Sequence, residues 1–404
     1  MNFVENGICA SKGFRAGGTW CGIRKNKTKM DLAMIVSDTI CTAAGVYTKN
    51  KVKGAPLTVT KNNLANGTAQ AVICNSGNAN TCAPNGMELA EATCDLVAKA
   101  LDIAKTDVIV GSTGVIGRAM ELAPFETGIP ELAGKLSYSG SHEAATAIMT
   151  TDLVEKEVAV EFEVGGKTCH IGGIAKGSGM INPNMATMLC FLTSDVKISS
   201  EMLQKALSND ILDSFNQVCV DGDTSTNDTV TVMANGMAEN LEITGEGTAY
   251  DTFCENLAAI TRRLSYCIAG DGEGATKALT CQVDGAPTKE LARAISQSVI
   301  ASDLLKAAMF GQDANWGRIL CAIGYVDGDF TADNIDVKLT SEVGEVWVCE
   351  GSAHRAFSEE EATKILAVKD ITILVDMHQG NESATAWGCD LTYDYVKING
   401  DYRT

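Results

Sequence analysis

Proline and histidine are scarce in this sequence. Only six prolines occur in 404 residues, which argues against Pro-rich linkers between domains. The four histidines, His142, His170, His354 and His378, are scattered and form no HxxxH pair. We therefore expect neither a metal site nor a His-based catalytic triad. Any nucleophile in this chain would have to use another base.

Positive charge is also in short supply. The chain has 32 Lys and Arg residues against 51 Asp and Glu residues, for a net charge of −19. An acidic chain repels a phosphate backbone, so we expect no nucleic-acid partner. An anionic substrate would need a local cationic anchor, so any basic residue inside a glycine-rich loop becomes a binding candidate.

Long apolar runs are missing as well. No stretch of 18 apolar residues occurs, and the N-terminus has no basic segment followed by an apolar one. We therefore expect no membrane partner, no secretory signal and a cytoplasmic location. The 15 cysteines form no CxxC pair and no zinc-finger spacing. They are predicted to be buried free thiols in a reducing compartment.

The hydrophobic patterning predicts a mixture of strands and helices. Short apolar runs predict strands at 32–36, 71–74, 108–110, 158–164, 188–192, 230–233, 346–348 and 371–375. Longer periodic stretches predict helices at 87–101, 141–149, 200–215, 250–269, 288–301 and 359–367. Because the two kinds do not strictly alternate, an α+β layered fold is favoured over a doubly wound sheet. A polar turn at Gln282–Pro287 suggests the edge of a C-terminal domain.

The middle of the chain contains the segment KGSGMINPNMATML, residues 176–189. A flexible loop leads into Ala186–Thr187, and an apolar strand follows at once. A Thr hydroxyl is a weak nucleophile until a base takes its proton. A cut just before Thr187 would create an α-amino group of suitable pKa beside that hydroxyl. An ordinary loop-to-strand junction is the other interpretation of this segment alone.

Two further segments are rich in turn-forming and polar residues. The glycine-rich turn Gly111–Gly117 follows an apolar strand, and its backbone N–H groups could bind an oxyanion, although a plain structural turn would have the same sequence. The run Asp221–Thr229 is dense in carboxylates and hydroxyls. It does not fit a calcium loop, because Thr226 stands where glycine is needed. We interpret it as a self-hydrogen-bonded loop that ties strands together.

Taken together, these blocks resemble one known family. KGSGMINPNMATML, Gly13–Gly17, Lys29–Ala33, Ala43–Thr48, Asn75–Asn80, Gly111–Gly117, Met149–Asp152, Asp221–Thr229 and Gly311–Arg318 resemble, in order, the blocks of the ornithine acetyltransferase (glutamate N-acetyltransferase, ArgJ-type) family of arginine biosynthesis. They span the chain from end to end.

The resemblance implies a self-cleaving precursor with a particular fold. Members cut themselves between the residues matching Ala186 and Thr187, and the pieces remain together, usually as an α2β2 heterotetramer. The implied parts are an α chain of residues 1–186, a first part of the β chain at 187–286, and a C-terminal domain at 287–404. The implied fold is the ArgJ/DmpA-type αββα sandwich with a smaller α/β C-terminal domain.

The resemblance also implies the reaction and its residues. Thr187 would attack the acetyl group of N2-acetyl-L-ornithine, release L-ornithine, and pass the acetyl group to L-glutamate. Thr113 and Gly114 match the oxyanion-stabilising pair. The positions that match the substrate-binding residues are Thr150 (or its neighbour Thr151), Lys176, Thr187, Glu273, Asn399 and Thr404. No cofactor or metal is implied, although acetyl-CoA is a possible co-substrate.

The physical chemistry of these residues agrees with that assignment. Lys176 supplies a cation for the substrate α-carboxylate, and Glu273 suits the side-chain ammonium of ornithine. Asn399 and Thr404 lie in the last six residues, so this tail would have to fold back into the site. Two alternatives remain open: a self-processing aminopeptidase or amidase of the DmpA type, and an inactive amino-acid-binding protein on the same fold.

Overall fold

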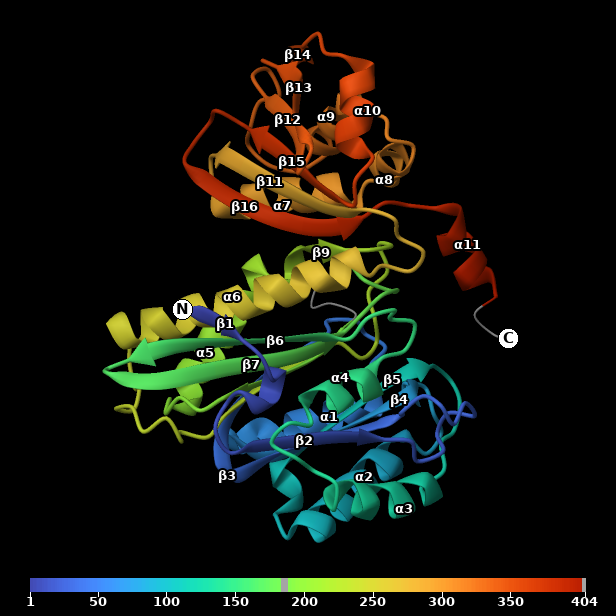
Figure 1. Ribbon diagram of the computed structural model, residues 1–404, viewed down its shortest axis with the longest axis vertical. Coiled ribbons are helices and arrows are strands. Elements are labelled where there is room, and N and C mark those ends of the chain that lie inside the picture. Colours follow the sequence, from blue (N-terminus) through green and yellow to red (C-terminus); the bar gives the residue numbers. More distant parts are fainter. Residues whose placement is uncertain (183–187, 402–404) are drawn as a thin grey trace. The chain divides into compact units, whose positions relative to one another are not determined.

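The computed structural model describes residues 1–182 and 188–401, which form two compact units (Figure 1). Unit 1 comprises Met1–Gly177, Asn184–Ile211 and Thr224–Leu264, whereas unit 2 comprises Ser178–Pro183, Leu212–Asp223 and Ser265–Thr404. The chain therefore passes between the units several times. The domain edge expected at residue 287 falls within unit 2 in this division.

Unit 1 is built on a nine-stranded sheet. Its strand order is β1-β6-β7-β8-β10-β3-β4-β5, and β2 pairs with β3. The strands are β1 (Asn2–Val4), β2 (Phe14–Thr19), β3 (Leu32–Tyr47), β4 (Thr68–Asn78), β5 (Val108–Val115), β6 (Lys156–Val164), β7 (Lys167–Lys176), β8 (Leu189–Ser194) and β10 (Thr229–Ala234).

The long strand β3 allows this sheet to fold over on itself. Cys74 and Ile109, from β4 and β5, share one core cluster with Ile174 and Phe191, from β7 and β8. The same cluster includes residues of α4 (Ser141–Ile148). The two halves of the sheet therefore face each other across a common core.

Helices cover the outer faces of both halves. Ile73 packs with α2 (Gly86–Leu101) and α3 (Ala123–Ala133) on the face opposite to its neighbour Cys74, as strand alternation requires. On the other half, Gly173 lies close to Leu264 and Ile260 of α6 (Thr248–Gly270). The remaining helices of unit 1 are α1 (Ala55–Asn63) and α5 (Ser200–Asp210). The order of layers is helix, sheet, sheet, helix.

Unit 2 is a seven-stranded mixed sheet with helices. Its order is β14-β13-β12-β15-β11-β16-β9. The strands are β9 (Val218–Cys219), β11 (Ala278–Ala286), β12 (Asp336–Ser341), β13 (Gly344–Glu350), β14 (Ala353–His354), β15 (Asp370–Asp376) and β16 (Glu382–Cys389). The helices are α7 (Lys289–Ala301), α8 (Asp303–Phe310), α9 (Trp316–Gly324), α10 (Glu359–Leu366) and α11 (Tyr393–Gly400).

The fold class expected from the sequence, α+β with layered sheets, is confirmed. Two local predictions differ from the structure. The helix predicted over 200–215 ends at Asp210 and continues as short 3₁₀ turns. The polar turn predicted at Gln282–Pro287 is mostly strand, because Ala278–Ala286 forms β11, paired on both sides within the sheet. The segment is polar because polar and apolar residues alternate along the strand, not because it forms a loop.

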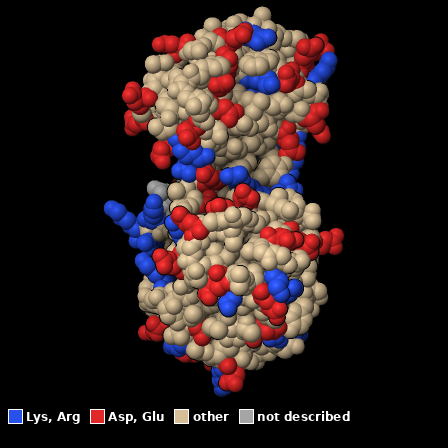
Figure 2. Space-filling model, turned by 90° about the vertical axis from the view of Figure 1, so that its left-hand side faces the viewer, with Lys and Arg blue, Asp and Glu red and all other residues tan. Residues whose placement is uncertain are grey.

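Ten of the fifteen cysteines are buried free thiols, as the sequence predicts, whereas Cys82 and Cys321 are exposed. The reducing compartment remains a prediction. No helix among the described residues is long and apolar enough to cross a membrane. On the face shown in Figure 2, acidic side chains spread over the surface, and basic ones occur in small groups between them. The absence of a nucleic-acid partner remains a prediction.

Candidate active site

Three predicted site residues, Ala186, Thr187 and Thr404, lie outside the described residues. The site is therefore described from its neighbours, beginning with Met188. The Met188 N–H donates to Asp228 Oδ1 at 3.1 Å, and the Met188 carbonyl accepts from Thr229 N at 3.1 Å. The residue after the predicted nucleophile is thus held at both backbone groups.

Strand pairing brings Lys176 to the same place. In the antiparallel β7–β8 pair, Lys176 lies opposite Leu189, and in the parallel β8–β10 pair Leu189 lies opposite Thr229. The last residue of β7 therefore sits beside the start of β8, two positions after Thr187. Here the sheet itself, rather than a loop, positions the lysine.

Thr113 and Gly114 lie at the end of β5, where the β4–β5 ladder is irregular. The register shifts between Gly77 and Asn78, and such an irregularity removes backbone groups from regular pairing. Gly114 has φ +128°, and a Cβ there would lie 2.4 Å from the carbonyl carbon of Gly77. Only glycine fits this close approach. An irregular strand end suits the oxyanion role predicted for the pair.

One side chain connects these two strand ends. Asn227 Nδ2 donates to the Ser112 carbonyl at 3.0 Å and to the Ala79 carbonyl at 2.6 Å. Its neighbour Asp228 holds Met188, as described above. Consecutive residues therefore tie the residue before Thr113 to the residue after Thr187. In unit 1 the residue before the predicted oxyanion pair and the residue after the predicted nucleophile therefore belong to one hydrogen-bonded assembly.

The Asp228 carboxyl is buried, and only one of its two oxygens has a hydrogen-bond partner among the described residues. Oδ1 accepts from Met188, whereas Oδ2 has no hydrogen-bond partner among the described residues. Burial raises the pKa of Asp228 well above its usual value, although the Met188 N–H, the Thr48 and Ser225 hydroxyls and the Lys176 ammonium oppose the shift. This environment favours the neutral form of the carboxyl over the charged form.

Lys176 belongs to a buried charge cluster with Asp152 and Lys156. Asp152 Oδ1 accepts from Lys156 Nζ at 2.8 Å and from Gly177 N at 2.7 Å, while Lys176 Nζ lies 3.8 Å from Oδ2. The side chains of Lys176, Lys156 and Asp152 are 6%, 1% and 0% exposed. Burial by itself would raise the pKa of Asp152, but the two ammonium groups lower it below its usual range. Asp152 therefore forms ion pairs with both ammonium groups.

Thr150 is fixed by the same aspartate. Its N–H donates to Asp152 Oδ2 at 2.9 Å, and both Thr150 and Thr151 are half-buried. Asp152 thus links the turn that carries Thr150 to the strand end that carries Lys176. This arrangement agrees with a shared role but does not separate Thr150 from Thr151.

In unit 2, Glu273 and Asn399 contact each other. Asn399 Nδ2 donates to Glu273 Oε2 at 2.8 Å, and the Glu273 N–H donates to the Ser178 carbonyl at 2.9 Å. Glu273 is 8% exposed, and no ion pair to it occurs among the residues that the structure describes. A Cβ on Gly179 would lie 2.4 Å from the Glu273 carboxylate, so the KGSG loop passes directly over it.

Asp221 secures the next part of this loop. Its carboxylate accepts from Met180 N at 2.6 Å, from Ile181 N at 2.8 Å and from the Tyr395 hydroxyl at 3.1 Å. Burial and the nearby Asp221 charge raise the pKa of Tyr395, which therefore stays a donor. The C-terminal helix α11 is thus connected to the segment just before the predicted cut. The tail does fold back onto unit 2 as far as it is described.

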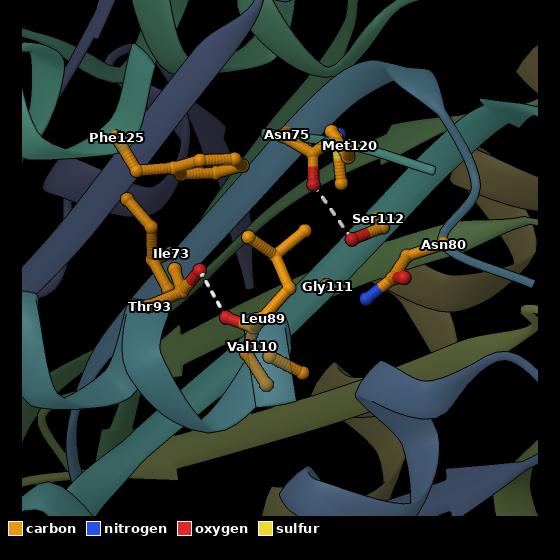
Figure 3. A pocket seen from close by; sticks show the side chains of 11 residues that line it. Ile73, Asn75, Asn80, Leu89, Thr93, Val110, Gly111, Ser112, Met120 and Phe125 are labelled. Carbon is orange, nitrogen blue, oxygen red and sulfur yellow. Dashed lines mark hydrogen bonds between the residues drawn. The ribbon is translucent and has the colours of Figure 1, made fainter. Parts of the chain in front are cut away.

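The side chains shown in Figure 3 line a narrow space beside β4, β5 and α2 that is too small to hold a water molecule. Ser112 Oγ donates to Asn75 Oδ1 at 2.6 Å at its rim, and the rest is largely apolar, with Phe125, Met120 and Leu89. None of the six described candidates lines this pocket. We regard it as packing space behind the Thr113–Gly114 strand end rather than as a substrate site.

Sequence reasoning did not assign roles to four residues that organise these strand ends: Asp152, Lys156, Asn227 and Asp228. Asp152 lies in the family block Met149–Asp152, and Asn227 and Asp228 lie in the block Asp221–Thr229. Their polar side chains inside these blocks were the sequence feature that could have indicated a role. Lys156 lies two residues before the strand predicted at 158–164, and no sequence pattern marks it. The described residues contain no cluster of three or more His, Cys, Asp or Glu side chains suited to a metal ion.

Comparisons with known proteins agree with the family resemblance found in the sequence. The model of the ArgJ family matches residues 15–404. The arginine biosynthesis bifunctional protein ArgJ of Caldanaerobacter subterraneus is 47% identical over the full length of both chains, and that of Listeria monocytogenes is 44% identical, also over both full lengths. The crystal structure of a bifunctional ArgJ protein from Bacillus halodurans is 44% identical with a TM-score of 0.50; the match covers 52% of this chain and 97% of that one.

Proposed function

Because this chain belongs to the ArgJ family of arginine-biosynthesis acyltransferases, we propose that it transfers the acetyl group of N2-acetyl-L-ornithine to L-glutamate through acetyl-Thr187. The observation that supports this most directly is the Asn227–Asp228 connection. It ties Ser112, beside the oxyanion pair, to Met188, beside the nucleophile. Acyl transfer requires a nucleophile and oxyanion donors in one place.

The reaction has two half-reactions. Thr187 Oγ attacks the acetyl carbonyl while its proton passes to the α-amino group created by the cut, and that proton then leaves with ornithine. Backbone donors at Thr113 and Gly114 stabilise the negative charge on the carbonyl oxygen, an interaction worth about 3 kcal/mol of barrier in other acyl transferases. The amino group of glutamate then takes the acetyl group and frees Thr187.

Self-cleavage before Thr187 is part of the proposal. The curated relatives match over their full length, but the crystallised relative is a chain only slightly more than half as long as this one. Residues 187–404 make up about that share of the chain. Such a chain length is what a cut at this position in family members would produce. We further propose that both pieces stay together as an α2β2 assembly.

Substrate recognition follows from charge. Both amino acids carry an α-carboxylate, for which Lys176 offers a nearly buried ammonium, with Thr150 beside it. Ornithine alone carries a side-chain ammonium, for which Glu273 offers a carboxylate oriented by Asn399. Thr404 is proposed to join them. The relatives' description as bifunctional motivates acetyl-CoA as a second acetyl donor.

The first experiment is an intact mass measurement under denaturing conditions, with Thr187→Ala beside the wild type. We expect two wild-type fragments, 1–186 and 187–404, and a single uncut, inactive Thr187→Ala chain. Incubation with acetylornithine and saturating glutamate should give N-acetylglutamate. Release of free acetate instead would indicate the aminopeptidase or amidase alternative, and an active Thr187→Ala chain would refute the mechanism.

A further inference from the structure

Two stretches of unit 1 contain no acidic residue, although the whole chain carries a net charge of −19. No Asp or Glu occurs in residues 39–87 or in residues 108–120. The loops of these stretches carry exposed basic side chains, here called the basic group: Lys49, Lys51, Lys53 and Arg118. A local excess of positive charge on an acidic protein attracts an anionic ligand to that place.

The loop that carries the three lysines is fixed to the segment that organises the strand ends. Backbone carbonyls of residues 224–228 accept hydrogen bonds from this loop, donated by Thr48 N at 3.0 Å, Asn50 Nδ2 at 2.9 Å and Gly54 N at 3.0 Å. The same segment holds Ser112 through Asn227 and Met188 through Asp228. The lysine loop therefore lies beside the residues that adjoin the proposed oxyanion pair and nucleophile.

Thr81 joins the loop of Arg118 to the lysine loop. The Thr81 carbonyl accepts a hydrogen bond from Gly117 N at 2.9 Å. A Cβ on Gly54 would lie 2.8 Å from the Thr81 hydroxyl oxygen, so Gly54 also contacts this residue. Gly54 follows Lys53 in the chain, and Gly117 precedes Arg118. Basic residues from the two loops are therefore held on either side of Thr81.

The basic group has no internal counter-ion. Within residues 1–182 and 188–401, its side chains make no hydrogen bond and no ion pair. Their donors are thus available to an anion, and Lys and Arg side chains are common ligands of phosphate. One α-carboxylate needs only one cation, for which Lys176 is already proposed. Several cations in two loops match a ligand with several phosphate groups.

We infer that the basic group binds the phosphates of acetyl-CoA. In this molecule a long uncharged arm separates the acetyl thioester from a 3′-phosphorylated ADP group. The phosphates can therefore bind at the two loops while the thioester enters the site. Val52 and Ile116, in the same loops, are 49% and 39% exposed and offer apolar surface to the arm.

The inference rests on the proposed function, in which acetyl-CoA is a second acetyl donor, and it gives that donor a binding site. In the transfer step, Thr187 Oγ forms an ester bond with the acetyl carbon and the C–S bond breaks. The CoA sulfur leaves with the proton of the Thr187 hydroxyl. The basic group takes no part in this step, so it should affect the binding of one donor and not the chemistry.

The test measures N-acetylglutamate formation with each acetyl donor separately. The triple variant Lys49→Gln/Lys51→Gln/Lys53→Gln removes three charges from exposed loop positions. We expect KM for acetyl-CoA to rise about tenfold, as for the loss of several exposed ion pairs, and to respond less to added salt. KM for acetylornithine, which has no phosphate, should stay the same. S-acetyl-N-acetylcysteamine, a thioester without the nucleotide, should serve both proteins equally.

A second triple variant, Lys12→Gln/Lys99→Gln/Lys197→Gln, is the matched control. It makes the same change in net charge at exposed positions of unit 1, and these lysines form no ion pair within the described part of the chain. Lys12 N donates to Asp195, which follows the end of β8 opposite to Met188. This variant should use acetyl-CoA as the wild type does. Equal losses in the two triple variants would refute a localised phosphate site.

The outcomes separate this inference from the proposed function. Unchanged KM for acetyl-CoA in the first triple variant would refute the inference alone, and so would an equal loss with both donors. Titration calorimetry with CoA gives a readout that does not depend on turnover. A wild type that uses acetylornithine but neither uses acetyl-CoA nor binds CoA would refute the inference and the second donor together. No N-acetylglutamate from acetylornithine would refute the proposed function itself.

Discussion

Lys176 and Glu273 are opposite charges in different units, and each is nearly buried. Lys176 has the Asp152 carboxylate at 3.8 Å, whereas no ion pair to Glu273 occurs among the described residues. Their supports differ. Lys176 stands at the end of a central strand, next to the Asp152–Lys156 ion pair. Glu273 lies in a turn beneath the KGSG loop, and its one side-chain partner, Asn399, comes from α11.

The difference concerns how firmly each charge is held. β7 is paired on both sides within the sheet of unit 1, whereas α11 buries none of its residues. A helix without a buried face gains little from packing and opens at low free-energy cost. We therefore regard Lys176 as a fixed anchor common to both substrates and Glu273 as an adjustable contact that discriminates between them.

The largest effect is expected from Lys176→Met. Methionine keeps the chain length and removes the charge, so the α-carboxylates of acetylornithine and glutamate both lose their cation. We expect kcat/KM to fall about a hundredfold for both substrates. Lys167→Met, at the exposed opposite end of β7, is the control and should behave as wild type. A loss confined to one substrate would contradict a common anchor.

A smaller and selective effect is expected from Glu273→Gln. The amide keeps the shape and still bonds Asn399, but it no longer attracts an ammonium group. KM for acetylornithine should rise about tenfold, with glutamate changed little, because only ornithine has a side-chain ammonium. Competition assays with ornithine check the same point. Equal losses for both substrates would show that Glu273 does not discriminate.

The smallest effect is expected from Asp228→Asn, and it concerns thermal stability. In the uncut Thr187→Ala background, Asp228→Asn can still accept from Met188 N. Because burial raises the pKa of Asp228, the folded state holds its proton above pH 4 while the unfolded state releases it, so stability falls as pH rises. The Asn variant lacks this loss and should melt higher than its parent near pH 7, with no difference below about pH 4.

Thermal unfolding followed at several pH values measures this difference. Asp195→Asn is a suitable control, because Asp195 is equally buried but accepts from Lys12 N and His170 N and faces the His170 ring at 2.8 Å. That variant should be destabilised near pH 7. A pH-independent gain in Asp228→Asn would mean that its carboxyl is not neutral in the folded chain.

Local pattern accounted for much of this protein. Continuous apolar runs such as Ala71–Cys74 predicted strands correctly, because these strands are buried on both faces. The segment Asp221–Thr229 was interpreted as a loop that ties strands together through hydrogen bonds. The structure agrees, since its carboxylates accept hydrogen bonds from backbone N–H groups of other segments. Features that depend on a residue and its neighbours in the chain could therefore be predicted from the sequence.

The sequence by itself determined the fold class and the family, and it predicted the residues proposed for the reaction. Strand pairing and side-chain contacts decided the rest: that Lys176 is set beside Leu189, that Asn227 reaches Ser112, and that Lys156 pairs with Asp152. Burial and charge balance depend on which distant segments meet, and no local spacing encodes that. The buried position of Lys176 beside Asp152 exists only in the folded chain, because only folding brings the two segments together.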